Sequence, residues 1–259
     1  MDLTGLVFNI EDAFADMADL HRQAYNHAFE DLGLNWIWTR AMYAGVLDLP
    51  DGPGRIMDFM LRRHPDFATA FDVGGLYETI YRIKQQHFSR SIAAGRATPR
   101  PGVLRLLEES DRAGLKSGAI MQGTESDFDQ LIRKLTGRPP EKAFTAWHVF
   151  EAGGLHMREG ARNARVDLLA RLGEQAGSLV AIEDSDRSAD VSVELGMPVL
   201  ATPGIYSSSD KFGTSRMVLS DLGQRDAPYR VIRGLDLKAP LVGVDTLRTI
   251  VGVPDQSSG

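Results

Sequence analysis

The chain has 259 residues, 43% of them hydrophobic and 25% charged, which suits one large globular domain or a core with a smaller inserted domain. Its formal net charge of -6 disfavours a nucleic acid or an anionic membrane as a partner. The absence of cysteine excludes disulfides and thiolate metal sites, and no apolar stretch approaches the roughly 20 residues that span a bilayer. The sequence does not open with a basic region followed by an apolar run, so we expect no signal peptide and a cytoplasmic location.

The first part of the sequence predicts one strand followed only by helices. The apolar run over about residues 3–9 predicts the strand, and Asp16 is expected to cap a helix that ends at Gly33. Further helical periodicity covers about residues 39–48, 54–63 and 74–92. These patterns predict an all-helical segment inserted after a single strand.

From about residue 99 onward, helices and strands alternate. The predicted helices cover about residues 103–113, 125–135, 163–173 and 187–195. The predicted strands cover about residues 117–121, 144–150, 179–182, 198–201 and 217–219. Such alternation is typical of an α/β fold with a doubly wound parallel sheet. The predicted division is a core of residues 1–15 and 93–245, a helical cap domain of residues 16–92, and a polar tail of residues 246–259.

Polar residues follow several of the predicted strands. In a doubly wound sheet, ligands bind beyond the carboxyl ends of the strands. The strand-end residues are Asn9, Met121 with Gln122, the loop after Phe150, and Glu183 with Asp184. We therefore expect the functional site at these positions.

Several segments, in this order, resemble a known family. They are Leu6 to Asp16, Asp19 to Asn26, Asn35 to Trp38, Tyr43 to Leu47, Arg100 to Val103, Ile182 to Ser185, Gly196 to Val199 and Thr202 to Tyr206. The set resembles the haloacid-dehalogenase phosphatases with a helical cap after the first strand, the beta-phosphoglucomutase-like branch, and within it the CbbY-type sugar-bisphosphate phosphatases. The resemblance implies a Rossmann-like core, a helical cap, Mg2+ and a small sugar phosphate as ligand.

The first family motif is altered at its two reactive positions. Asn9 stands where the resemblance implies a nucleophilic aspartate, and Glu11 stands at the position of the acid/base aspartate. A carboxylate can attack phosphorus, whereas a carboxamide cannot do so usefully at neutral pH. Glu11 has the right group on a longer stem, so it is either an acid/base or a solvated loop carboxylate.

The second and third motifs are altered as well. Met121 stands where the family offers a serine or threonine hydroxyl, and a thioether cannot donate that hydrogen bond. Thr124 is expected to cap the next helix rather than to reach back to a phosphate. The family lysine has no counterpart, because Glu159 is its best match and no lysine occurs between residues 142 and 211. Arg158 or Arg162 could supply a cation instead, unless it is only a solvated surface residue.

Two carboxylates retain the metal-binding element of the family. Glu183 and Asp184 are predicted to hold Mg2+ weakly, since Mg2+ prefers oxygen ligands, or else to be a relic that caps the next helix. In the cap, the substrate loop keeps Arg55 but has Pro53 in place of a lysine. The predicted substrate-binding residues are Gln122, Arg158, Arg55 and His21, and Arg22 and Lys84 are expected to face the same cleft.

Three hypotheses for the function follow. In the favoured one, a haloacid-dehalogenase-like protein has lost phosphatase activity and acts as a binding or regulatory protein, with a small sugar phosphate or a protein as partner. The alternative is a Mg2+-dependent phosphatase of a small sugar phosphate with rearranged catalytic residues. The third is a structural subunit whose cleft plays no part.

Overall fold

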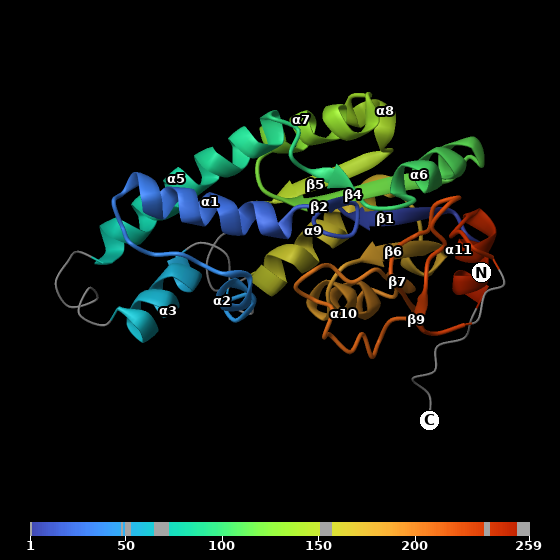
Figure 1. Cartoon of the computed structure of the whole chain (residues 1–259). Coiled ribbons are helices and arrows are strands. Elements are labelled where there is room, and N and C mark those ends of the chain that lie inside the picture. Colours follow the sequence, from blue (N-terminus) through green and yellow to red (C-terminus); the bar gives the residue numbers. More distant parts are fainter. Residues whose placement is uncertain are drawn as a thin grey trace.

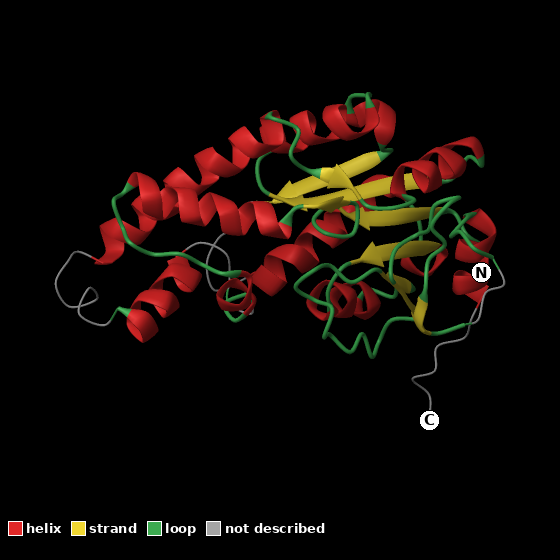
Figure 2. Ribbon diagram, in the orientation of Figure 1, coloured by secondary structure: helices red, strands yellow, loops and turns green. Residues whose placement is uncertain are grey.

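A computed structural model describes residues 2–47, 49, 53–64, 73–150, 157–235 and 239–252. It shows a central sheet with helices on both faces, and a group of helices beyond one end of the strands (Figures 1 and 2). Residue 48 of the predicted helix 39–48, and residues 253–259 of the predicted tail, lie outside the described residues. Within the described part of the chain, no helix is both long and apolar enough to cross a membrane.

The main sheet has the strand order β5-β4-β1-β6-β7-β8-β9. Its strands are β1 (Gly5–Asn9), β4 (Lys116–Gln122), β5 (Ala146–Phe150), β6 (Leu179–Glu183), β7 (Val199–Ala201), β8 (Met217–Leu219) and β9 (Val231–Arg233). All neighbours run parallel except β8 and β9, which pair antiparallel. The prediction of an α/β fold with a doubly wound parallel sheet is confirmed.

Helices cover both faces because the central strand is apolar on both sides. Leu6 and Phe8 of β1 belong to one apolar cluster and Val7 to the other. The first cluster takes side chains from α6 (Val103–Arg112), α7 (Glu125–Thr136) and α11 (Val244–Gly252), and the second from α9 (Met157–Leu172) and α10 (Asp186–Glu194). Side chains of a strand point alternately to its two faces, so a run of apolar residues indicates burial between two helical layers. The short helices α8 (Pro140–Ala143) and η2 (Ala176–Ser178) complete the core.

The segment between the first two long strands is helical, as expected. It contains α1 (Ala18–Asp31), α2 (Arg40–Ala44), α3 (Pro53–Arg63) and α5 (Val73–Ala93). These helices share an aromatic cluster of their own, in which Trp38 lies 5.2 Å from Phe29 and 4.5 Å from Tyr25 between ring centroids. A two-stranded ribbon of β2 (Ala15–Asp16) and β3 (Thr98–Pro99) joins the segment to the sheet.

The residue that caps α1 differs from the predicted one. Asp12 accepts hydrogen bonds from the backbone N–H groups of Met17 and Ala18, both at 2.8 Å, whereas Asp16 lies in β2. Asp12 has a φ of 58°, a left-handed conformation that aspartate tolerates better than most residues. The turn therefore folds back so that Asp12, rather than the residue next to the helix, reaches its first turn.

The C-terminal segment also differs from the prediction. Residues 246–252, expected to begin a polar tail, lie in α11, where Leu247 and Ile250 are fully buried in the first apolar cluster. The apolar spacing at positions 244, 247, 250 and 251 carries a helical pattern that flanking polar residues obscured. The edge strand β9 was not predicted either, because all three of its residues are exposed and it has no buried face.

Replacing Leu247 tests whether α11 belongs to the folded core. Leu247→Ala should lower the free energy of unfolding by about 2–5 kcal/mol, since it removes a buried side chain and leaves a cavity. Arg248→Ala, on the exposed face of the same helix, should change it by less than about 1 kcal/mol. Urea unfolding followed by circular dichroism measures both. Equal, small effects would mean that this segment is a tail after all.

Candidate functional site

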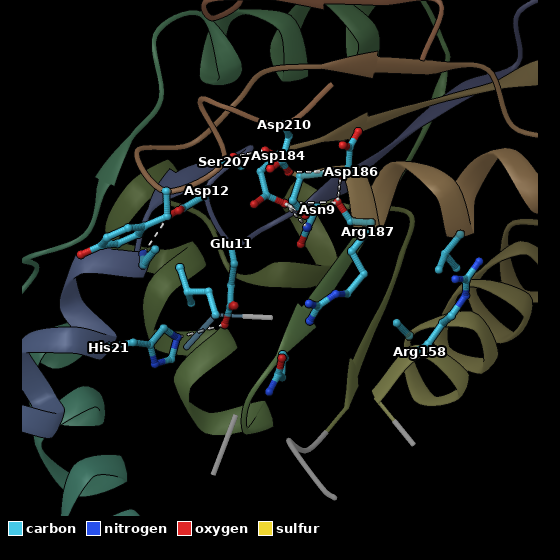
Figure 3. A pocket seen from close by; sticks show the side chains of 18 of the residues that line it. Asn9, Glu11, Asp12, His21, Arg158, Asp184, Asp186, Arg187, Ser207 and Asp210 are labelled. Carbon is cyan, nitrogen blue, oxygen red and sulfur yellow. Dashed lines mark hydrogen bonds and ion pairs between the residues drawn. The ribbon is translucent and has the colours of Figure 1, made fainter. Parts of the chain in front are cut away.

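A cavity of about 570 Å³ lies at the carboxyl ends of β1, β4 and β6, where helices of the inserted segment meet the core. It brings together most of the residues predicted to form the site: Asn9, Glu11, His21, Arg55, Gln122, Arg158 and Asp184. Figure 3 shows Asn9, Glu11 and Asp184 near one another, with His21 beside Glu11 and Arg158 farther away at the side of α9. Glu183, the other residue of the predicted metal-binding pair, does not line the cavity.

Asn9 is bonded to the carboxylate that faces the cavity. Its Nδ2 donates a hydrogen bond of 2.8 Å to Oδ1 of Asp184. The orientation of the amide follows from this partner, because a carboxylate accepts hydrogen bonds and only the NH2 end of an asparagine can donate one. The ends of β1 and β6 are therefore joined by an amide–carboxylate contact.

Glu183 is held away from the cavity by a buried ion pair. Its Oε1 accepts hydrogen bonds from Nη2 of Arg165 at 2.8 Å and from the hydroxyl of Ser192 at 2.5 Å. The side chains of Glu183 and Arg165 are 1% and 3% exposed. Side chains alternate along β6, so Glu183 points toward α9 and α10 while Asp184 points into the cavity. Glu183 is therefore not placed as the metal ligand that the sequence predicted.

Asp184 lies among other acids. Burial, and then the nearby carboxylates of Asp12, Glu183 and Glu11, hold the pKa of Asp184 well above its usual range. Its Oδ1 also accepts from the hydroxyls of Ser185 at 3.4 Å and Ser188 at 3.3 Å. The cavity floor is thus rich in acidic groups and in hydrogen-bond acceptors.

Glu11 and His21 form a second contact on the cavity wall. Nε2 of His21 lies 3.3 Å from Oε1 of Glu11, and the imidazole stacks on Phe88 at 3.9 Å between centroids. The ring is fixed by this stacking, which aims Nε2 at the carboxylate. Glu11 is therefore oriented by a partner instead of being an unconstrained loop side chain.

The second motif is arranged differently from the prediction. Met121 is fully buried in the first apolar cluster and does not line the cavity, whereas its neighbours Ile120 and Gln122 do. Side-chain alternation along β4 explains this difference. Thr124 caps α7 as expected, accepting from the N–H of Asp127 at 3.0 Å.

Two of the predicted cations have partners within the protein. Nε of Arg55 donates to the carbonyl of Leu49 at 2.9 Å, and Arg158 forms an ion pair with Glu194. Arg162 is exposed on α9 and does not line the cavity. Arg158 is 61% exposed, so it stands at the rim.

Lys84 and Arg22 were expected to face the cavity, but neither of them lines it. The Lys84 ammonium is fully buried, 5.1 to 5.6 Å from the ring centroids of Tyr25, Tyr81 and Phe88. Nε of Arg22 donates to Asp19 at 2.7 Å. Both side chains stabilise the helical segment itself.

Comparison with known proteins supplies the family. No family model matches the chain. It is 30% identical over 226 residues to the plasmid-borne protein CbbY of Cupriavidus necator, covering 87% of this chain and 88% of that protein. The chain belongs to the CbbY family of the haloacid-dehalogenase superfamily.

The crystal structure of CbbY from Rhodobacter sphaeroides in complex with phosphate is similar over 85% of this chain and 94% of that one, with 25% identity and a TM-score of 0.70. An aspartate-to-asparagine mutant of the same protein, in complex with xylulose-1,5-bisphosphate, matches equally well.

A magnesium site of the type implied by this CbbY-type fold is not matched by the donors present. Glu183 is engaged with Arg165 and Ser192, and its second oxygen, although without a hydrogen-bond partner in the described residues, is buried away from the cavity. Oδ1 of Asp184 already accepts from Asn9, whose neutral amide brings no charge. Within the described ranges, no three histidine or acidic side chains gather as a metal site would require. Asp184 is the one carboxylate of the predicted pair that faces the cavity.

One loop of this CbbY-family cavity was not anticipated. Asp186 accepts hydrogen bonds from the backbone N–H groups of Lys211 and Phe212, and its own N–H donates to Asp210 at 2.9 Å. The Ser207 hydroxyl donates to the carbonyl of Asp184. These bonds tie residues 184–186 to the loop 207–212, which places Arg187 on the cavity wall. No local pattern in the sequence signals these bonds, because Asp186 and its partners lie more than twenty residues apart in the chain.

Asp19 connects the helical segment to the core. The Tyr206 hydroxyl donates to Oδ1 of Asp19 at 2.7 Å, and Tyr206 and Asp19 lie 187 residues apart in the chain. Asp19 also accepts from Arg22, and the hydrogen bond from Arg22, followed by that from Tyr206, holds the pKa of the Asp19 carboxyl far below its ordinary value of 3.8. Burial, and then the hydrogen bond to Asp19, raise the pKa of Tyr206.

Loss of the charge of Glu183 should lower the free energy of unfolding, whereas loss of the charge of Asp184 should not. Glu183→Gln leaves the Arg165 guanidinium buried without its counter-charge and should cost about 3–5 kcal/mol of unfolding free energy at neutral pH. Asp184→Asn should leave stability equal or higher, because a carboxyl whose pKa is raised in the folded state costs stability once the pH exceeds its unfolded pKa. Urea unfolding in excess EDTA compares the two. A neutral Glu183→Gln would contradict the structural role of the pair.

The lowered pKa of Asp19 predicts a pH-dependent contribution to stability. A depressed carboxyl pKa stabilises the fold above the unfolded pKa, about 4, and this contribution is lost as the pH falls through the folded value. The wild type should therefore be more stable than Asp19→Asn at neutral pH, with a difference that shrinks in acid. Chemical denaturation over a pH series measures it. Glu108→Gln, in an exposed pair with Arg112, is the control and should cost less than about 1 kcal/mol.

Proposed function

We propose that this CbbY-family protein binds a small sugar phosphate in the cavity, has lost phosphatase activity, and acts by binding as a regulatory or accessory protein. In this proposal residues 16–92 act as a cap domain on a core of residues 1–15 and 93–245. The catalytic positions Asn9 and Glu11 then serve ligand binding, together with His21 and Gln122.

One observation carries the loss of activity: the amide of Asn9 donates to Asp184 at the point where the motif implies a nucleophile. The lone pair of an amide nitrogen is delocalised into its carbonyl group and is not available to attack phosphorus, and the amide oxygen is a poor nucleophile. Glu183, bound to Arg165, and the absence of lysine between residues 142 and 211 support the same conclusion. Phosphoryl transfer depends on cations that neutralise the developing charge, and acids outnumber cations on the cavity floor.

The ligand class rests on the relatives and on the cavity. CbbY of R. sphaeroides binds phosphate, and its aspartate-to-asparagine mutant binds xylulose-1,5-bisphosphate. A volume of about 570 Å³ is ample for a ligand of that size. The mutant complex supports the idea that an asparagine in this fold is compatible with binding a sugar bisphosphate.

A hydrolase with rearranged chemistry is the second candidate. The contact between Glu11 and His21 supports it, because a carboxylate oriented by an imidazole can activate water as a general base. Arg158, invoked as a replacement for the lysine, is at the rim and paired with Glu194, which weakens this alternative. In this case Glu11→Gln abolishes turnover and Asn9→Ala is tolerated.

Phosphate release from a panel of sugar phosphates, including xylulose-1,5-bisphosphate, tests the proposal. The purified chain with Mg2+ should release no more phosphate than its Asp184→Ala variant. Activity that appears in Asn9→Asp and is absent from the wild type would support loss of the nucleophile as the cause. Robust wild-type turnover that disappears in Asp184→Ala would overturn the proposal in favour of the second candidate.

A further inference from the structure

We propose that Arg187 binds the phosphate group of the ligand from the α10 side of the cavity. The inference rests on the proposed function, in which the cavity holds a phosphorylated ligand. It assigns the positive charge to a different wall from the one where the family motif implies a lysine. That motif lies at the start of α9, where Glu159 stands.

Position is the first argument. Arg187 is the second residue of α10, lines the cavity, and is exposed there. In Figure 3 its side chain extends into the cavity, and in that view its guanidinium lies below Asn9, between Glu11 and Arg158. A guanidinium in this place can reach a ligand that sits over the end of β1.

Three other arginines of the lining are either buried in the protein or stand at the rim of the cavity. Arg165 is buried and bonded to Glu183 and Ser192, so it cannot turn toward a ligand without leaving a carboxylate uncompensated. Arg55 is buried in the helical segment, where backbone carbonyls and Tyr43 fix it. Arg158 is at the rim with Glu194. Arg187 also interacts with other residues of the chain, but it is exposed and lines the cavity close to the strand ends.

The backbone around Arg187 is rigidly supported. Its predecessor Asp186 is bonded through both its carboxylate and its N–H to residues 210–212. Its successor Ser188 donates to the carbonyl of Ser185 at 3.0 Å. A binding side chain on a backbone fixed on both sides loses less freedom on binding, which favours affinity.

Charge is the last argument. A phosphate entering a cavity with Glu11, Asp12 and Asp184 on its wall is repelled unless a cation meets it. A guanidinium presents parallel N–H donors that match two phosphate oxygens, a geometry that a lysine ammonium does not offer. Arg187 therefore provides both the charge and the donors that the motif lysine no longer supplies.

Calorimetric titration of the full chain with inorganic phosphate, and separately with xylulose-1,5-bisphosphate, tests the role of Arg187. Arg187→Gln should weaken binding of both by at least about tenfold, or about 1.4 kcal/mol. Arg187→Lys, which keeps the charge but not the fork of donors, should recover only part of the affinity. Arg162→Gln is the matched control, since it removes the same charge from an exposed position outside the lining and should stay within about twofold of the wild type. Thermal unfolding of each variant establishes that it is folded.

Several results would overturn the assignment. Unchanged phosphate affinity in Arg187→Gln, with a lowered melting temperature, would make Arg187 an internal counter-ion of the acidic floor. Equal losses of affinity in Arg187→Gln and Arg162→Gln would mean that the net charge of the protein, and not a contact by Arg187, determines binding. No binding of either probe by the wild type would refute Arg187 and the binding half of the proposed function together. If the wild type hydrolyses the bisphosphate and Arg187→Gln binds it more weakly, the proposed loss of activity is refuted, while the binding role of Arg187 is supported.

Discussion

The buried ion pair between Arg165 and Glu183 is the contact on which the shape of the cavity depends. A carboxylate in the interior is costly unless a cation and further donors compensate it, and here Arg165 and Ser192 do so. The pair joins β6 to α9, and through Ser192 to α10, behind the floor of the cavity. With Glu183 satisfied on that side, Asp184 alone of the two faces Asn9, and the end of β6 presents one carboxylate to a ligand instead of two.

Much of the fold could be predicted because it follows from local patterns. Runs of apolar residues indicated the parallel strands, and helical spacing indicated an all-helical segment inserted after the first strand. Elements whose burial depends on distant partners were missed. The helix α11 packs against β6 and α6, which are distant in the sequence. The strand β9 was missed for another reason, since all three of its residues are exposed. The capping of α1 by Asp12 depends on a tight left-handed turn that no periodicity reveals.

Most of the residues that line the candidate site could be predicted from the sequence, but the directions of their side chains could not. Motif order was enough to place Asn9, Glu11, His21 and Asp184 around one cavity. The direction of each side chain was not accessible, because it depends on alternation at the strand ends: Met121 and Glu183 turn into the protein while Gln122 and Asp184 turn outward. Arg187 was overlooked since its place on the wall results from bonds to the loop 207–212, more than twenty residues further along the chain.

The hydrogen bond between Tyr206 and Asp19 has a consequence for the kinetics of ligand exchange. Tyr206 belongs to a loop of the core and Asp19 to α1, so any motion that parts the inserted helices from the sheet breaks this bond. A hydrogen bond to a charged group contributes about 1.5–3 kcal/mol, which lowers the population of opened molecules by roughly 10- to 100-fold. A ligand that leaves this bond intact enters and leaves the cavity more slowly by the same factor. In the proposed binding function, the residence time of a ligand then depends on Tyr206, which lines the cavity, through its bond to Asp19. The equilibrium affinity depends on the groups that contact the ligand.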